Sequence, residues 1–142
     1  RGATGDGLQF RVRLHPAADC WPAVFVVHGT SNGATVQRVH PLRPDLAGSA
    51  SFANWPKGAL PGGSDVVLPP SGIPPFQVAS APAFLLLVEG GAEPFAEPRL
   101  EHMERIVTGA LGGIADGTAV ATAANALMAT GLVVRWQVVE PR

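Results

Sequence analysis

The spacing of apolar residues changes near Pro94, and this change limits the possible folds more than any other feature of the chain. Before Pro94, apolar residues alternate with polar ones or form short runs bounded by glycine and proline, which is typical of β-strands. After Pro94, they recur at intervals of three and four between Leu100 and Ile114, as on one face of a helix. A β-rich part followed by helices predicts a single α+β domain over residues 1–142.

The β-rich part contains several candidate strands. Apolar and polar side chains alternate in residues 8–14, so one face of this strand would be buried and the other exposed, until His15-Pro16 ends it. Asn32-Gly33 is a strong signal for a hairpin turn because both residues tolerate positive φ. Together with the short apolar runs, these features predict strands at residues 8–14, 23–27, 34–40, 65–68, 76–78 and 83–88.

Residues 41–75 are rich in proline and glycine, so they cannot hold a long regular element. They also carry too many apolar residues for a disordered linker. These apolar residues are Leu46, Phe52, Trp55, Leu60, Val66, Val67 and Leu68. We therefore expect ordered loops that pack over a sheet, within a β-rich core that spans residues 5–95.

Residues 96–142 are expected to add two helices and one strand to that core. Pro98 suits the first turn of a helix, where its missing N–H costs nothing. A second helix is predicted over residues 118–130 and would stop at Gly131. Residues 132–139 form a last strand, which we expect to return to the sheet beside residues 8–14.

The expected fold is therefore a mainly antiparallel, β-sandwich-like α+β domain. It would contain six or seven short strands, with two C-terminal helices covering one face of the sheet. In the last strand, Val134, Trp136 and Val138 would share one face, and Arg135 and Gln137 the other.

Composition excludes several classes of protein. The formal net charge is -1, from 10 Lys+Arg and 11 Asp+Glu, which argues against a nucleic-acid-binding protein with a strongly basic surface. The longest apolar run, residues 83–88, is too short to span a membrane, so we expect a soluble domain without membrane contact. Cys20 is the only cysteine, which excludes an internal disulfide.

The chain opens with Arg1 rather than methionine, and no secretory signal follows. These features predict a processed product, an excised domain or a cloned segment, located in the cytoplasm.

Catalytic motifs are weak. A strand that ends in His28-Gly29 resembles the oxyanion-hole strand of α/β-hydrolases, but the Gly-x-Ser-x-Gly elbow of those enzymes is missing. Cys20 could act as a nucleophile with His28 or His40, although the adjacent Asp19 would disfavour a thiolate. The four histidines and Cys20 show no ligand spacing typical of a metal site. We therefore expect no cofactor, no metal and no catalytic residue.

The segment from Arg38 to Lys57 has the composition of a binding surface. Its candidate partner-binding residues are Arg38, His40, Arg43, Asn54 and Trp55. Trp and Arg are enriched at the energetic centres of protein interfaces, which favours a protein partner. In the alternative interpretation, Trp55 fills the open side of the sheet and belongs to the core.

Residues 5–95 resemble a bacterial family of domains of unknown function that are often attached to caspase-fold peptidases and serine/threonine kinases. The resemblance runs through residues 5–12, the strand at 23–27, Asn32-Gly33, His40-Pro41-Leu42 and the closing segments up to Phe95. It implies a compact accessory module in bacterial signalling or defence, with no catalytic residues to carry over. The helices and the last strand lie outside it.

Three functions follow as hypotheses. The first is a non-catalytic accessory or interaction module that docks or regulates a linked or partner enzyme. The second is a structural subunit that forms an oligomer through the helix face of Met103, Val107 and Leu111. The third is a small hydrolase that uses His28 or Cys20.

Overall fold

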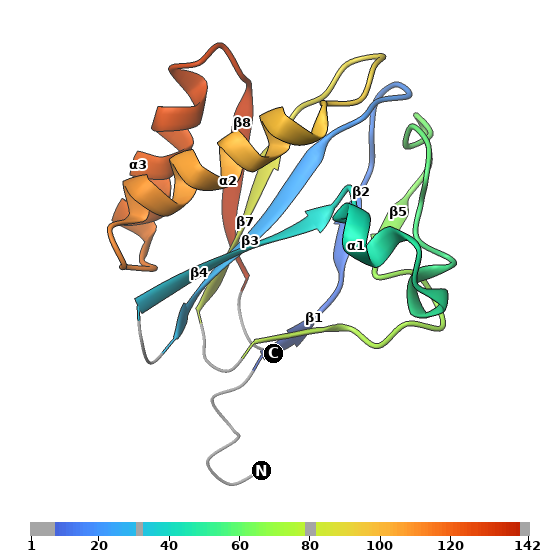
Figure 1. The fold of residues 1–142 in the computed structure, drawn as a ribbon, viewed down its shortest axis with the longest axis horizontal. Helices are drawn as coiled ribbons and strands as arrows, with labels where there is room; N and C mark the ends of the chain where they lie inside the picture. The colour runs from blue at the N-terminus through green and yellow to red at the C-terminus, as the bar shows by residue number, and fades with distance from the viewer. Residues whose placement is uncertain (1–7, 31–32, 79–81, 140–142) are drawn as a thin grey trace, which may run out of the picture.

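Four antiparallel strands form the central sheet, in the order β4-β3-β7-β8 (Figure 1). They are β3 (Ala23–Thr30), β4 (Gly33–His40), β7 (Ala83–Val88) and β8 (Val134–Val139). This computed structural model describes residues 8–30, 33–78 and 82–139. The β3–β4 hairpin is confirmed, because Thr30 pairs with Gly33, whereas the predicted turn residue Asn32 lies outside the described residues.

The two inner strands are buried on both faces. In β3, Ala23, Phe25 and Val27 belong to one core, and Val24 and Val26 belong to another. Strand β7 is similarly divided between the two cores. This arrangement explains why both segments are continuous apolar runs rather than alternating ones.

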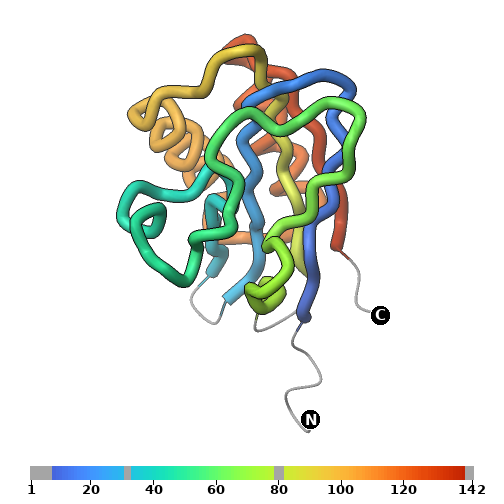
Figure 2. Tube along the Cα trace, turned by 90° about the vertical axis from the view of Figure 1, so that its right-hand side faces the viewer, coloured from blue at the N-terminus to red at the C-terminus, as the bar shows by residue number. Residues whose placement is uncertain are grey.

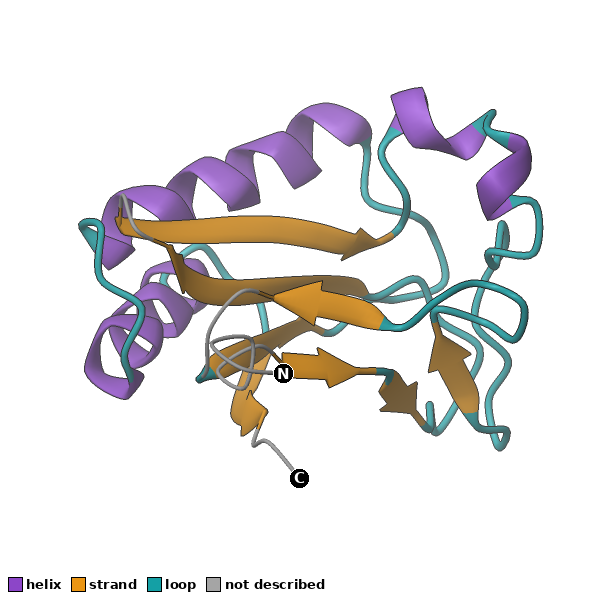
Figure 3. Ribbon diagram, turned by 90° about the horizontal axis from the view of Figure 1, so that it is seen from below, coloured by secondary structure: helices purple, strands orange, loops and turns teal. Residues whose placement is uncertain are grey.

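Two helices cover one face of the sheet: α2 (Glu97–Leu111) and α3 (Gly117–Met128). Figure 3 shows them on one side of the sheet, with the short strands on the other. Gly112 caps the C-terminus of helix α2 and adopts a left-handed φ of 61°. Ile114, predicted on the apolar face of this helix, is instead 56% exposed, because the helix ends three residues earlier.

The helix face proposed for oligomer formation is not available. Met103 and Val107 are almost completely buried, and Leu111 is 4% exposed, because all three pack in the core between the helices and the sheet. An oligomer through this face is therefore excluded as long as the domain is folded.

A second β layer packs against the other face of the sheet. It consists of β1 (Leu8–Phe10) paired with β6 (Phe76–Val78), and β2 (Val12–Leu14) paired with β5 (Val66–Leu68). Apolar side chains of this layer pack on the sheet face that carries Val24 and Val26. The predicted α+β class with antiparallel sheets is confirmed.

The single strand predicted over residues 8–14 is in fact two strands separated by Arg11. The two halves pair with different segments, and a proline-rich stretch, residues 69–75, lies between those segments. The Arg11 Nη1 donates a hydrogen bond to the carbonyl of Pro69 (2.7 Å), at the point where the pairing changes. The chain therefore has eight described strands rather than six or seven.

The loop region 41–75 is ordered and packed, as predicted. It contains the short helix α1 (Pro44–Ala47), the 3-10 helix η2 (Ala50–Phe52) and strand β5. Figure 2 shows this green segment beside the blue N-terminal strands. Leu60 is completely buried, so the segment contributes to the hydrophobic interior.

The last strand does return to the sheet, but not to the predicted partner. Strand β8 pairs with β7 along its whole length, from Ala83–Val139 to Val88–Val134. Residues 8–14 pair only within the second layer. Among the helices that the structure describes, none has the length and apolar character required to cross a bilayer.

Candidate binding cavity

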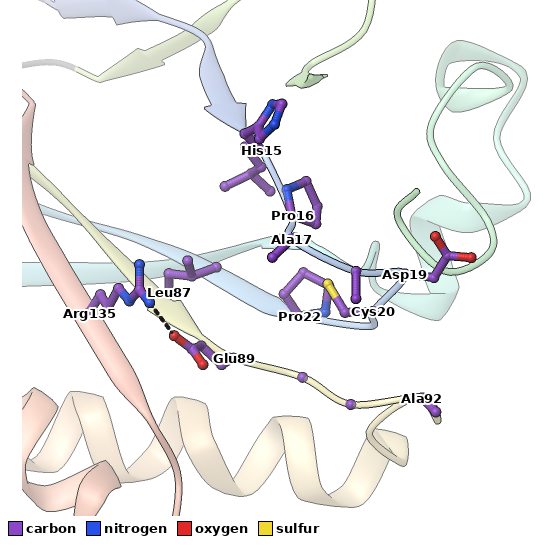
Figure 4. Close-up of a pocket in the computed structure, with 14 residues that line it drawn as sticks. His15, Pro16, Ala17, Asp19, Cys20, Pro22, Leu87, Glu89, Ala92 and Arg135 are labelled. Atoms are coloured by element: carbon purple, nitrogen blue, oxygen red, sulfur yellow. Dashed lines mark ion pairs between the residues drawn. The ribbon is translucent and has the colours of Figure 1, made fainter. Parts of the chain in front are cut away.

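A cavity of about 460 Å³ opens at one end of the sheet (Figure 4). Its walls come from three parts of the chain that are distant in sequence. The segment between β2 and β3 forms one wall, the segment after β7 forms the second wall, and Arg135 of β8 forms the third wall. The lining residues are Leu14, His15, Pro16, Ala17, Ala18, Asp19, Cys20, Pro22, Leu87, Glu89, Gly90, Gly91, Ala92 and Arg135.

Backbone hydrogen bonds fix the walls in place. Cys20 and Leu60 exchange two bonds, with N–O distances of 3.1 and 2.7 Å. The N–H of Trp21 donates to the carbonyl of Gly91 (3.1 Å), which joins the first wall to the second. The Asp19 carboxylate accepts from the N–H of Gly62 (2.8 Å). The cavity is therefore formed by the fold itself, before any ligand binds.

Gly90 allows the two walls to approach each other. A Cβ atom at this position would overlap the carbonyl oxygen of Trp21, far inside van der Waals contact. The atoms that this Cβ would meet belong to the backbone of Trp21 and Pro22, so no side-chain movement could relieve the overlap. The close approach of these segments thus requires glycine at position 90.

The cavity combines apolar walls with one ion pair. Leu14, Leu87 and Pro22 supply apolar surface. The Arg135 Nη2 and the Glu89 Oε2 are 2.8 Å apart, and both side chains remain partly exposed, 74% for Arg135 and 40% for Glu89. A ligand would therefore meet apolar surface, a hydrogen-bond donor and an acceptor in one site.

The thiol of Cys20 lies in this cavity but is not activated. Its pKa is raised above the ordinary value of 9.0, first by burial and then by the negative charges of Asp19 and Glu89. The thiol is accordingly protonated at neutral pH, and a protonated thiol is a poor nucleophile.

The histidines suggested as bases for Cys20 are elsewhere. Neither His28 nor His40 is among the residues that line the cavity. The His28 Nδ1 contacts the carbonyl of its own neighbour Gly29 (3.2 Å). His15 does line the cavity, but its Nδ1 is engaged with Asp65 Oδ1 at 2.8 Å. The structure therefore does not form the predicted Cys–His pair.

The predicted partner-binding surface is largely buried. Arg38, His40 and Trp55 are 4%, 2% and 3% exposed, so these three cannot contact a partner in the folded domain. Of the five predicted partner-binding residues, only Arg43 and Asn54 are exposed. The ring of Trp55 packs against Phe52 and Phe76, with centroids 5.8 and 6.1 Å away, which confirms the alternative interpretation that Trp55 belongs to the core.

His40 is buried next to Trp55. The Trp55 indole Nε1–H donates a hydrogen bond to His40 Nδ1 (3.3 Å), which requires the imidazole to accept at that nitrogen. Burial lowers the pKa of His40 from 6.5 to about 4. The side chain is therefore neutral at neutral pH and serves the core rather than the surface.

Arg38 joins the sheet to helix α2. Its Nη2 donates to both carboxylate oxygens of Glu97, at 3.0 and 2.8 Å, and its Nη1 is 3.4 Å from Glu104. Glu104 also pairs with the exposed Arg43 at 2.8 Å. The charge of Arg38 is thus neutralised within the fold, which explains how an arginine can be buried here.

The sequence did not indicate the cavity because no local motif marks it. Its lining residues are mostly small or apolar, and their proximity depends on the pairing of β7 with β8 and on the close approach at Gly90. Within the described part of the chain, no three His, Cys, Asp or Glu side chains are grouped so that they could hold a metal ion.

Comparisons with known proteins add no family. No protein-family model matches the chain, and neither the curated proteins nor the solved structures give a significant match. The resemblance of residues 5–95 to a bacterial accessory domain therefore remains a prediction.

Proposed function

We propose that this chain is a non-catalytic interaction module that binds a segment of a partner or linked protein in the cavity between residues 14–22 and 89–92. By holding that segment, the module docks or regulates the enzyme that carries it. The resemblance of residues 5–95 extends the proposal to a peptidase or kinase in bacterial signalling or defence.

The observation that carries the proposal is the preformed cavity. Its volume of about 460 Å³ lies within the range of roughly 300–1,000 Å³ in which small-molecule and cofactor sites are found. A peptide of a few residues needs apolar surface for its side chains and polar groups that fix its orientation. Leu87 and Pro22 supply the first, and the Glu89–Arg135 pair supplies the second.

The state of Cys20 favours binding over hydrolysis. A cysteine hydrolase needs a thiolate with an adjacent base. Here the surrounding charges are negative and raise the pKa of the thiol. The same negative charges at Asp19 and Glu89 favour a ligand that offers N–H groups or a positive charge.

The test starts from a random peptide library selected on the immobilised domain. The affinity of a selected peptide is then measured for the wild type, for Ala17→Trp and for Ala53→Trp. Ala17 lines the cavity, whereas Ala53 is also an exposed alanine but lies outside it, so the second variant controls for the added bulk. We expect Ala17→Trp to weaken binding at least tenfold and Ala53→Trp to leave it unchanged.

Two results would contradict the proposal. One is a selection without binders, or binders with the same affinity for both variants. The other is hydrolysis of ester or peptide substrates by the purified domain that disappears in Cys20→Ala, because the module would then be an enzyme.

A further inference from the structure

Strand β8 has an open edge. It is the terminal strand of the four-stranded sheet, and among the described residues no strand pairs with its outer side. Two large apolar side chains on this strand are exposed, Trp136 at 38% and Val138 at 43%. An exposed apolar edge strand is a template for further strand pairing.

The register shows which backbone groups face outward. The N–H of Glu89 donates to the carbonyl of Val133 (2.9 Å), so this opposed pair is hydrogen-bonded. Hydrogen-bonded pairs alternate along an antiparallel ladder. The β7–β8 register is continuous, so Arg135 and Gln137 direct their backbone groups toward β7. Those of Val134, Trp136 and Val138 consequently face the open edge.

We propose that this edge pairs with β8 of a second copy of the chain, antiparallel and about a two-fold axis at Trp136. The two sheets would then join into one continuous sheet. The outward-facing residues of the two copies meet, which allows about six inter-chain backbone hydrogen bonds. This proposal rests on the strand edge and not on peptide binding, although Arg135 of β8 also lines the cavity.

The side chains of β8 are complementary to themselves in this register. On the helix side of the sheet, Trp136 lies opposite its own copy and Val134 lies opposite Val138, so the exposed apolar side chains become covered. On the other side, Arg135 lies opposite Gln137. Arg135 carries the only charge of the strand and is already paired with Glu89, so no like charges oppose each other.

Apart from Arg135, whose charge is paired with Glu89, the edge lacks the features that normally prevent pairing. Lysine, proline and bulges protect natural edge strands. Strand β8, with the sequence VRWQVV, contains neither lysine nor proline, and its pairing with β7 shows no bulge. The opposite edge, β4, does show a register shift in its pairing with β3, between Val24 and Phe25, and it packs against α2. A second copy therefore fits the β8 edge and not the β4 edge.

The first test is the solution mass, measured by sedimentation or light scattering over a range of concentrations. At high concentration, we expect the wild type to have a mass of twice the 14.6 kDa of one chain. Val138→Pro removes an outward N–H, which an edge strand tolerates, and Trp136→Lys places like charges opposite each other. Both variants should be monomeric. Asn125→Lys adds the same charge on an exposed position of α3 and should remain dimeric.

A second test needs no variant and so does not depend on whether one folds. Amide hydrogen exchange is measured on the wild type at low and high concentration. Exchange at Trp136 and Val138 should slow at least tenfold at high concentration, whereas exchange at Arg135 and Gln137 should be slow at both. A wild type that stays monomeric at millimolar concentration, or a folded Val138→Pro variant that stays dimeric, would overturn the proposal.

Discussion

Acid should destabilise this domain through His40. The imidazole is 2% exposed and accepts a hydrogen bond from Trp55, so protonation would place a charge in the core and remove the acceptor. Burial lowers its pKa from 6.5 to about 4 in the folded state. The unfolded chain therefore binds a proton at a higher pH than the folded domain does, and stability must fall as the pH falls through this interval.

The size of the effect follows from the two pKa values. The contribution of His40 is fully present above pH 6.5, declines below that value and is lost at about pH 4. One pKa unit corresponds to about 1.4 kcal/mol, so acidification from about pH 7.5 to about pH 4.5 should lower the free energy of unfolding by about 2 to 3 kcal/mol through this residue alone.

Urea unfolding at several pH values measures this effect. The free energy of unfolding is compared for the wild type, for His40→Gln, which keeps a hydrogen-bond acceptor, and for His15→Gln, which changes an exposed histidine. The slope of stability against pH should flatten in His40→Gln and remain steep in His15→Gln. Parallel pH profiles for the wild type and His40→Gln would refute the reasoning.

Three further predictions concern the cavity and the ionic contacts. Gly90→Ala should prevent the close approach at Trp21 and strongly lower the urea concentration at the midpoint of unfolding. Gly91→Ala has open space around its Cβ and should leave the midpoint unchanged. Equal midpoints for the two variants would contradict the geometry. Arg38→Ala should lower the free energy of unfolding by about 2 to 3 kcal/mol because it leaves the partly buried Glu97 carboxylate unpaired, whereas Arg43→Ala at a half-exposed pair should lower it by less than about 1 kcal/mol. Urea unfolding measures the loss of free energy of unfolding in each variant. Similar losses for Arg38→Ala and Arg43→Ala would show that burial does not strengthen the Arg38 ion pair. Because its pKa is raised, Cys20 should react with a disulfide reagent near pH 8 more slowly than a free thiol does. Asp19→Asn should increase this reaction rate. An unchanged rate would show that the charge of Asp19 does not act on the thiol.

The regular elements could be predicted from the sequence because their signals are local. The apolar runs at Phe76–Val78 and Ala83–Val88 and the helical spacing after Pro94 coincide with β6, β7 and α2. Each of these signals depends on side chains that lie within a few residues of one another.

What could not be predicted depends on long-range packing. The sequence of residues 8–14 reads as one strand, and its division at Arg11 is decided by two different partners more than 50 residues away. Arg38 and His40 look like surface residues, but Glu97 of α2 neutralises the first and Trp55 covers the second. The cavity likewise exists only once its three segments have come together.

The central claim is that the cavity binds a segment of another protein, and a titration followed by amide chemical shifts tests it most directly. A peptide selected on the domain is added to the labelled protein. The account predicts saturable shift changes that concentrate at Ala17, Cys20 and Gly91, which line the cavity. Changes that concentrate instead around the exposed Arg43 and Asn54, with the cavity unaffected, would contradict it.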